Sequence, residues 1–467
     1  SPPCDFRSHC REPRLAHITL PRLISIDMKN LALHWKILIA LVLAFALGIT
    51  ANSLTEGIES KPAWFDNLEY GTRFLGTLFL NALKMVVVPL VTTSIICGII
   101  NVGGEKDFGR LGRKTLAFYA ASGFFAVVTG LLCVNLLQPG EVDPDLRATM
   151  LAQESAAHQE KIAGALENAS GGFRSVLEIF QRMIPSNLFI AAAEGQLLGL
   201  IFFSLLLGFF ISKLPENHRE SQTRFWESFN GAILAITKFI IGFAPFGVFG
   251  LVTPTIMTTG TELFGVMGQF AATVLLGLAI HAFVILPLFL KFVAREKPLK
   301  HFHAMSPALL TAFSTASSSA TLPLTMECVQ KRAGVSRKVT SFTLPLGATV
   351  NMDGTALFEC VVVVFLAQLF GIEMGLVTQF SVVLMALLTS IGVAGIPSAS
   401  LVAIIVILNA VGFPEASIAT GIGIVYVVDR ILDMTRTAVN VFGDSCAAVV
   451  IGKSEGETDY YPETNTN

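Results

Sequence analysis

Charged side chains are scarce in this sequence. Asp, Glu, Lys and Arg make up 14% of its 467 residues, and their charges almost cancel, to a net charge of -2. A chain without a basic excess offers no surface that would hold a nucleic acid, so that class of partner is excluded. Hydrophobic residues reach 53%, and apolar runs recur from Ile37 to the end of the chain. We therefore predict an all-α polytopic membrane protein.

Paired cysteines are also missing. The chain has seven cysteines, and five of them lie in apolar or re-entrant segments without ligand-like spacing. Neither a disulfide framework nor a structural metal site follows from this pattern, and we expect no organic cofactor.

The first 27 residues lack both an initiating Met and the apolar core of a signal peptide. Met28, by contrast, opens the short basic segment MKNLALHWK. We interpret residues 1–27 as a non-native or upstream extension and leave them out of the fold prediction.

The apolar runs predict about eight transmembrane helices. Clear spans cover residues 37–54, 74–102, 116–137, 197–211, 233–257 and 264–290, and three later apolar blocks are interrupted by Gly, Pro, Ser and Asn. Lys and Arg cluster in four places, and the positive-inside rule assigns these clusters to the cytoplasm. The clusters lie at residues 106–114, 213–224, 295–300 and 331–338. The acidic stretch 141–178 then lies outside, and both termini are cytoplasmic.

Two stretches interrupt the later apolar blocks in the same way. Residues 311–325 read TAFSTASSSATLPLT and residues 390–400 read SIGVAGIPSAS, where a span would need apolar side chains. Non-helical backbone at membrane depth survives only where it is buried in protein or lines an aqueous cavity. We predict two re-entrant helical hairpins, each followed by a span, and the first of these spans breaks at residues 351–354. Two ordinary spans kinked by Gly and Pro are the alternative.

Two hairpins that each precede a polar span are typical of the inverted repeats that build secondary transporters around a site at the middle of the membrane. The hairpin ends present free N–H groups and positive helix termini. Such ends suit an anionic cargo.

The last apolar block carries a polar stripe. Asp429, Asp433, Arg436, Asn440 and Asp444 follow one another at steps of four, three, four and four residues, so they share one face of a helix. A charge in hydrocarbon costs at least about 2.5 to 3.5 kcal/mol, so these groups must face partners, water or a cargo. Intramembrane ionisable residues mark ion and substrate pathways, and we interpret the stripe as a binding site. A purely structural ion-pair network is the alternative.

With the two tips, the NMDGT break and the segment DRILDMTRTAVNVFGD in this order, the chain resembles the dicarboxylate/amino acid:cation symporter family. That family includes bacterial glutamate/aspartate transporters and animal excitatory amino acid transporters. The resemblance implies a homotrimer of elevator type, in which early spans form a static scaffold while the other spans carry the cargo. The implied parts are scaffold helices in 28–112 and 184–258, a transport domain in 113–139 and 259–456, an external polar loop in 140–183 and a cytoplasmic tail in 457–467.

The resemblance also implies which residues hold the substrate. They belong to the two hairpin tips, the broken span and the polar helix: Ser317, Ser318, Ser319, Thr355, Gly395, Ile396, Pro397, Ser400, Asp433, Arg436, Thr437 and Asn440. In the family, the position of Asp433 holds the amino group and that of Arg436 the side-chain carboxylate. The chemistry agrees, because a guanidinium fork pairs with a carboxylate and a carboxylate one turn away neutralises an ammonium. Together they describe an amino acid with an acidic side chain.

Sodium coupling is a further implication of the resemblance, since the family surrounds sodium ions with hard oxygens. For a first ion, the expected ligands are the carbonyls of Gly347, Asn351 and Asn440 and the carboxylate of Asp444. A second ion would use the backbone near Thr349, Ser390 and Ile391. A third family site uses Asn351, Asp353 and two adjacent hydroxyl residues, which here read Ser122 and Gly123. One hydroxyl is missing, so we expect the third site to be weak.

Glu359 lies one turn beyond Thr355, at a position where animal members carry a Glu. A buried carboxyl without a fixed cation can carry a proton, and a satisfied structural Glu is the alternative. The lone histidines His34 and His281 are interpreted as packing or interface residues.

These observations predict a secondary active symporter that imports L-aspartate or L-glutamate with sodium and protons, and not an enzyme. We expect a multi-pass protein of a bacterial inner membrane, surrounded by lipid. A C4-dicarboxylate symporter is an alternative, but such a cargo has no cation to neutralise Asp433. An intramembrane aspartyl protease would use Asp429 and Asp433, yet these lie on one helix, whereas a catalytic dyad needs carboxyls from separate elements.

Overall fold

The computed structural model describes residues 33–55, 58, 61–103, 108–144, 147, 181, 184–193, 197–259, 263–392 and 400–462. Helices make up almost all of this part of the chain. In order they are α1 (Leu33–Thr55), α2 (Ala63–Gly103), α3 (Phe108–Leu137), α7 (Leu188–Ala193), α8 (Leu197–Ser212), α9 (Glu216–Ile241), α10 (Ala244–Thr259), α11 (Leu263–Ile280), η1 (His281–Ile285), α12 (Leu286–Leu288), η2 (Phe289–Ala294), α13 (Pro298–Thr315), α14 (Ser318–Glu327), η3 (Cys328–Arg332), α15 (Arg337–Val350), α16 (Asp353–Phe370), α17 (Leu376–Gly392), α18 (Ser400–Ala410) and α19 (Glu415–Ser454).

Several helices have the length and composition of membrane spans. Within the described ranges, five are long and apolar enough to cross a membrane, and α9 with α10, bent by 50° at their junction, forms a candidate sixth. The helices α8, α17 and α18 are apolar but shorter. The all-α membrane architecture is thus confirmed, while the number of about eight spans stays a prediction. The predicted extension 1–27 and most of the predicted external loop 140–183 lie outside the described residues.

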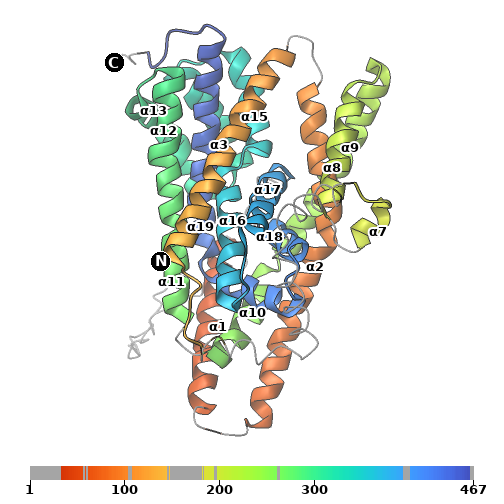
Figure 1. The fold of residues 1–467 in the computed structure, drawn as a ribbon, viewed down its shortest axis with the longest axis vertical. Helices are drawn as coiled ribbons and strands as arrows, with labels where there is room; N and C mark the ends of the chain where they lie inside the picture. Colours follow the sequence, from red (N-terminus) through yellow and green to blue (C-terminus); the bar gives the residue numbers. More distant parts are fainter. Residues whose placement is uncertain are drawn as a thin grey trace, which may run out of the picture.

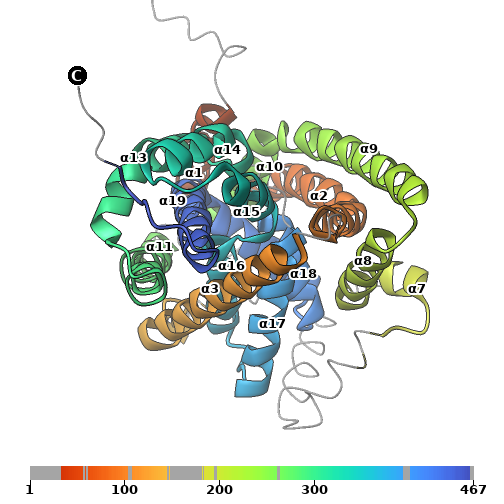
Figure 2. The same ribbon diagram turned by 90° about the horizontal axis from the view of Figure 1, so that it is seen from above.

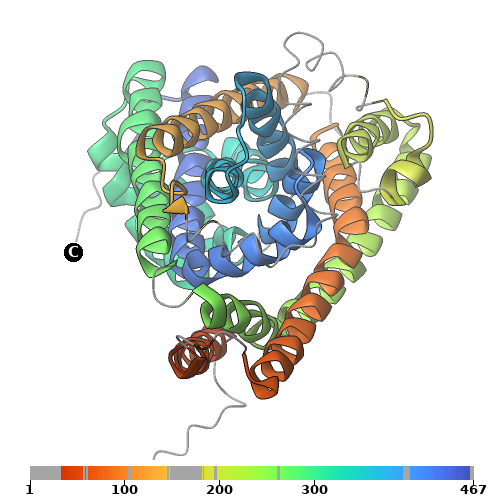
Figure 3. The same ribbon diagram turned by 60° about the horizontal axis from the view of Figure 1, so that its bottom comes forward.

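The helices form two neighbouring groups. On one side α1 and α2 pack against α10, and α2 also packs against α8 and α9, as Figures 1 and 2 show. The other group is built around α19, which packs against α11, α13, α15 and α16. Figure 3 shows α1, α2 and α10 side by side at the lower end of the molecule. The helices α17 and α18 join the groups, since both contact α2 as well as α16.

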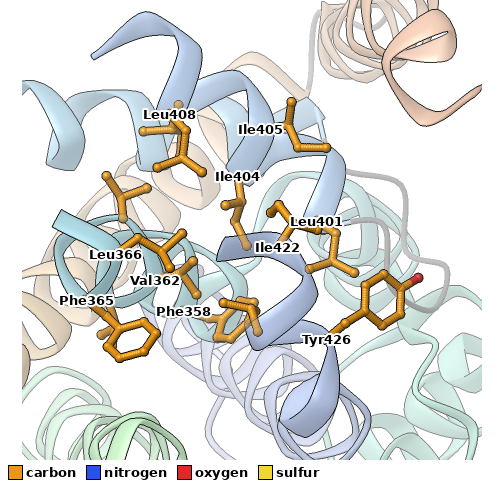
Figure 4. Packing of buried hydrophobic residues seen from close by; sticks show 14 of the residues in the cluster. Phe358, Val362, Phe365, Leu366, Leu401, Ile404, Ile405, Leu408, Ile422 and Tyr426 are labelled. Carbon is orange, nitrogen blue, oxygen red and sulfur yellow. The ribbon is translucent and has the colours of Figure 1, made fainter. Parts of the chain in front are cut away.

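Helix α16 is the centre of the apolar core. Its sequence is hydrophobic on all sides, and every residue in it except Gln368 is buried. Side chains of α16, α18 and α19 interlock in this core (Figure 4), among them Phe358, Val362, Phe365, Leu366, Leu401, Ile404, Ile405, Leu408, Ile422 and Tyr426. The polar residues at the start of α16 are therefore held on a rigid, tightly packed support.

The first predicted hairpin is present. Helix α13 ends where Ala316 adopts a left-handed conformation with φ of 50°, and α14 then runs back against α13. Ser317 caps α14, because its Oγ accepts a hydrogen bond of 3.2 Å from the backbone N–H of Ala320. The reversal explains why small hydroxyl residues fill this part of the sequence.

The predicted break is also present, since α15 ends at Val350 and α16 begins at Asp353. The two arms of the second predicted hairpin correspond to α17 and α18. Its tip, residues 393–399 with Gly395, Ile396 and Pro397, lies outside the described residues.

Candidate functional site

The polar stripe lies on α19 and is buried along its whole length. Asp429, Asp433, Arg436, Asn440 and Asp444 are each at most 7% exposed, as the sequence predicted for groups that share one inward face. The helix they occupy packs against α13, α14, α15 and α16. Side chains from the first hairpin and the broken span therefore surround the stripe.

The centre of the stripe is an arginine between two carboxylates. Arg436 is 1% exposed and donates hydrogen bonds to Asp429 Oδ1 at 3.1 Å and to Asp433 Oδ1 at 2.7 Å. Its guanidinium also lies over the ring of Phe358 on α16, with Cζ 3.8 Å from the ring centroid. These contacts hold a planar, permanently charged fork in the interior of the protein, and such a fork is well suited to bind a carboxylate.

A second cluster ties α19 to the start of α16. Asn440 Oδ1 accepts a hydrogen bond of 2.8 Å from the backbone N–H of Gly354, and Asn440 Nδ2 donates to Thr355 Oγ1 at 3.1 Å. A Cβ at Gly354 would lie 2.9 Å from the carbonyl oxygen of Arg436, so only glycine permits this approach. The predicted substrate residues Thr355 and Asn440 are thus brought together.

A third cluster surrounds Asp444. Asn351 Nδ2 donates to Asp444 Oδ1 at 2.9 Å. A Cβ at Gly347 would lie only 2.3 Å from Asp444 Oδ1 and 2.7 Å from Tyr119 Oη, so this glycine lets the carboxylate approach the end of α15. The Tyr119 hydroxyl donates to the carbonyl oxygen of Thr343 at 2.8 Å. Three of the predicted sodium ligands, Gly347, Asn351 and Asp444, therefore converge.

The oxygens of the predicted third sodium site lie next to this cluster. Ser122 Oγ on α3 is 3.2 Å from Asp353 Oδ1 and 3.4 Å from Asn351 Oδ1. A Cβ at Gly123 would be 3.5 Å from Asp353 Oδ1 and 3.2 Å from Leu387 Cδ2, so a side chain here would point toward the same carboxylate.

Asp353 and Asp444 are at most 2% exposed, and within the described ranges neither pairs with a Lys or Arg. Two buried carboxylates without a Lys or Arg partner are costly at membrane depth. Hard cations prefer oxygen ligands such as those gathered here. The residues present therefore fit a small hard cation such as sodium.

His281 is a residue that sequence reasoning missed. A lone histidine in an apolar run was interpreted as packing, yet His281 is fully buried and its Nε2 lies 3.1 Å from Asp353 Oδ2. It stands at the start of η1, a π-helical segment, and such segments are frequent at functional sites. Tyr119 was missed as well. His281 comes from an apolar run in which no spacing links it to Asp353. Tyr119 lies one helical turn before the predicted site residue Ser122, and this spacing could have indicated it.

Glu359 lies deeper in α16 and is completely buried. Its Oε2 accepts a hydrogen bond of 2.8 Å from Thr389 Oγ1 on α17, while Oε1 has no hydrogen-bond partner in the described structure.

Other predicted residues are placed without such contacts. Ser318 is buried and Ser319 exposed at the start of α14, and Thr349 is exposed near the end of α15. The buried Ser400 hydroxyl lacks a hydrogen-bond partner within the described ranges, and Ser390 donates to the carbonyl oxygen of Leu387 at 3.0 Å. Thr437 Oγ1 donates to the Asp433 carbonyl at 2.8 Å, and Ile391 lies in the last turn of α17.

Comparison with known proteins decides the family. The model of the sodium:dicarboxylate symporter family matches residues 33–454. The chain belongs to this family. It is 33% identical over 433 residues to a protein of Bacillus caldotenax named proton/sodium-glutamate symport protein, with 92% of this chain and 96% of that protein covered. It is 31% identical to the proton/glutamate-aspartate symporter of Escherichia coli strain K12 over 92% of this chain and 95% of the relative.

A third relative, the neutral amino acid transporter B(0) of Bos taurus, is 34% identical over 88% of this chain and 78% of its own length. As a member of the sodium:dicarboxylate symporter family, the chain is an integral membrane transporter. Its relatives are named for both acidic and neutral cargoes. The side chains of this chain's own site must therefore indicate the cargo.

Proposed function

We propose that this protein is a secondary active symporter that takes up L-aspartate or L-glutamate together with sodium ions and protons. The observation that carries the proposal is the buried charge pair of Arg436 and Asp433, 2.7 Å apart on α19. The side chain of a neutral amino acid gives a buried guanidinium nothing to pair with, whereas an acidic side chain matches it in charge and geometry. The names of the bacterial relatives support the same cargo.

Cargo binding would exchange one ion pair for two. Before binding, Arg436 and Asp433 neutralise each other. The ammonium of an amino acid would pair with Asp433, which frees Arg436 Nη2 for the side-chain carboxylate of the cargo. Asp429 would remain paired with Arg436 Nη1, which lies 3.1 Å from it. The exchange gives the ammonium and the side-chain carboxylate each a charged partner, so neither of these two charges carries the penalty of an unpaired buried charge.

Sodium would act as the coupling substrate by neutralising Asp353 and Asp444. Without a cation these carboxylates leave the polar centre negatively charged, and moving that charge across hydrocarbon is unfavourable. The cation thus makes the loaded protein able to cross the membrane, which links cargo movement to the sodium gradient. A proton on Glu359 would remove a further buried negative charge in the same way.

The two helix groups support an elevator movement. In this proposal α1, α2, α8, α9 and α10 belong to the scaffold, and α3 with the helices from α11 to α19 moves with the cargo. We further propose a homotrimer in a bacterial inner membrane, surrounded by lipid and with both termini in the cytoplasm. Gly395, Ile396 and Pro397 would belong to the residues that hold the cargo.

Ligand-induced thermal stabilisation of the purified protein tests the proposed cargo. L-Aspartate should raise the melting temperature in sodium buffer and not in choline buffer, and succinate should have a much smaller effect. Equal stabilisation by succinate would instead identify a C4-dicarboxylate symporter. Stabilisation by L-alanine alone would identify a neutral amino acid transporter.

A further inference from the structure

Thr389 is not among the residues that sequence reasoning assigned to the site, yet it makes the contact that defines the surroundings of Glu359. Its Oγ1 lies 2.8 Å from Glu359 Oε2, and within the described ranges this is the single hydrogen bond of that carboxyl. Both residues are at most 1% exposed. Solvent therefore does not replace Thr389 as a partner.

The same hydroxyl has a second partner at the same distance. Thr389 Oγ1 is 2.8 Å from the carbonyl oxygen of Met385, one turn earlier in α17, and 3.3 Å from that of Ala386. A hydroxyl carries one proton and two lone pairs, so it can donate to only one acceptor at a time but can also accept. Its rotation therefore selects between two hydrogen-bond patterns without any movement of the heavy atoms.

These two patterns fit the two protonation states of Glu359. When the carboxyl is ionised, the Thr389 hydroxyl donates to it, and the bond is charge-assisted. When Glu359 takes up a proton from water, its new O–H donates to Thr389 Oγ1, and the hydroxyl proton turns to the Met385 carbonyl. In each state every proton in this chain of oxygens has an acceptor.

The charged group that acts on Glu359 from another helix is Arg436 of α19, and Cys360 is the titratable neighbour on its own helix. Neither donates a hydrogen bond to the carboxyl. Thr389, by contrast, lies on α17 immediately before Ser390, a predicted contributor to the second sodium site.

We propose that Thr389 is a positioning residue for the proton that Glu359 carries, and that its hydroxyl links proton uptake to α17. The inference rests on the proposed function, because it needs Glu359 to exchange a proton during transport. Without the hydroxyl, the ionised carboxylate loses its donor and holds its proton more tightly, so proton release is impaired. A side chain that keeps the hydroxyl keeps the exchange.

The test compares Thr389→Ala with Thr389→Ser, which differ from each other only by the hydroxyl. The full-length protein in liposomes is assayed for aspartate uptake between pH 5 and 9, with an internal pH dye that reports proton influx. We expect Thr389→Ala to move the midpoint of the pH profile upward by about one pH unit, a tenfold change in proton affinity. Thr389→Ser should stay within about 0.3 unit of the wild type, a twofold change.

Two controls separate this role from packing. Thr389→Val keeps the volume of the side chain without the hydroxyl and should behave like Thr389→Ala, which covers the case in which the smaller side chain fails to fold. Ser381→Ala removes a hydroxyl of the same helix whose hydrogen bond in the described structure goes to the Val377 carbonyl, and the pH profile of this variant should not move.

An unchanged midpoint in Thr389→Ala and Thr389→Val, or an equal shift in Thr389→Ser, would overturn the inference. A wild type whose uptake brings in no protons would overturn the proposed role of Glu359 first and the inference with it. Normal proton influx in the wild type together with unshifted variants would overturn the inference alone.

Discussion

Replacing Arg436 by Thr should remove affinity for acidic amino acids and spare part of the affinity for small neutral ones. The guanidinium is 1% exposed, and the proposed exchange gives it one bidentate partner in the cargo. Loss of a buried, hydrogen-bonded charge pair typically costs about 2 to 5 kcal/mol. That cost corresponds to a rise in the dissociation constant of aspartate by roughly 30-fold to several thousand-fold. Asp433 remains to hold the ammonium of any amino acid.

The same substitution also acts on stability, and a second variant separates the two effects. Without Arg436, the buried carboxylates of Asp429 and Asp433 lose the cation that now lies 3.1 and 2.7 Å away. Removing one partner of a buried ion pair lowers the free energy of unfolding by about 3 to 5 kcal/mol. Combining Arg436→Thr with Asp429→Asn removes one of the orphaned charges, so the double variant should be more stable than the single one and equally poor at binding aspartate.

Calorimetric titration of the purified variants with L-aspartate, L-serine and L-alanine in sodium buffer measures this prediction. Arg436→Lys is the matched control, because a lysine keeps the charge and lacks the planar fork. It should bind aspartate more weakly than the wild type and more tightly than Arg436→Thr. If aspartate affinity in Arg436→Thr stayed within about twofold of the wild type, less than about 0.5 kcal/mol, Arg436 would not select the cargo.

Three further variants test separate parts of the account. Glu359→Gln should keep aspartate binding and abolish its pH dependence and the proton influx, since the amide mimics the protonated acid. Gly123→Ser should place a hydroxyl near Asp353 and lower the sodium concentration for half-maximal aspartate binding, provided that the neighbouring leucine yields a few tenths of an ångström. Hydrogen bonds from Lys114 and Arg110 hold the pKa of the Glu455 carboxyl below its usual range. Glu455→Gln should therefore lower stability at pH 7 by at most about 1 kcal/mol.

Each of these variants has an outcome that contradicts its premise. Unchanged proton influx in Glu359→Gln, read with an internal pH dye, would exclude that carboxyl as the carrier. A transport stoichiometry of three sodium ions in the wild type, with unaltered sodium affinity in Gly123→Ser, would show that the missing hydroxyl is unimportant. The Glu455 contribution is present above the ordinary carboxyl pKa and is lost as the pH falls through its lowered pKa. A melting-temperature difference that persists well below that pH would have another cause.

Features that depend on local sequence could be predicted. The stripe on α19 follows from helical spacing, the break before Asp353 from Asn, Asp and Gly within four residues of an apolar span, and the reversal at Ala316 from the serine-rich tip. In each case the signal and the structure lie in the same twenty residues. Such signals are stronger in a membrane protein, because a polar residue inside the membrane is energetically costly and therefore rare.

Features that depend on convergence of distant segments could not be predicted. His281 reaches Asp353 from another helix, and its sequence surroundings are those of an ordinary apolar span. Thr389 meets Glu359 across 30 residues, and a threonine in a membrane helix usually bonds to its own backbone. Packing of whole helices decides these contacts, and no spacing in the sequence encodes it.

The central claim is that a sodium gradient drives uptake of acidic amino acids through the site formed by Arg436, Asp433 and the oxygens around Asp444. Liposomes that contain the purified protein should accumulate labelled L-aspartate above the external concentration only when sodium is higher outside, at constant pH on both sides. Gly347→Ala, whose Cβ would collide with Asp444 Oδ1, should abolish this accumulation. Equal accumulation in sodium-free choline buffer would contradict the account.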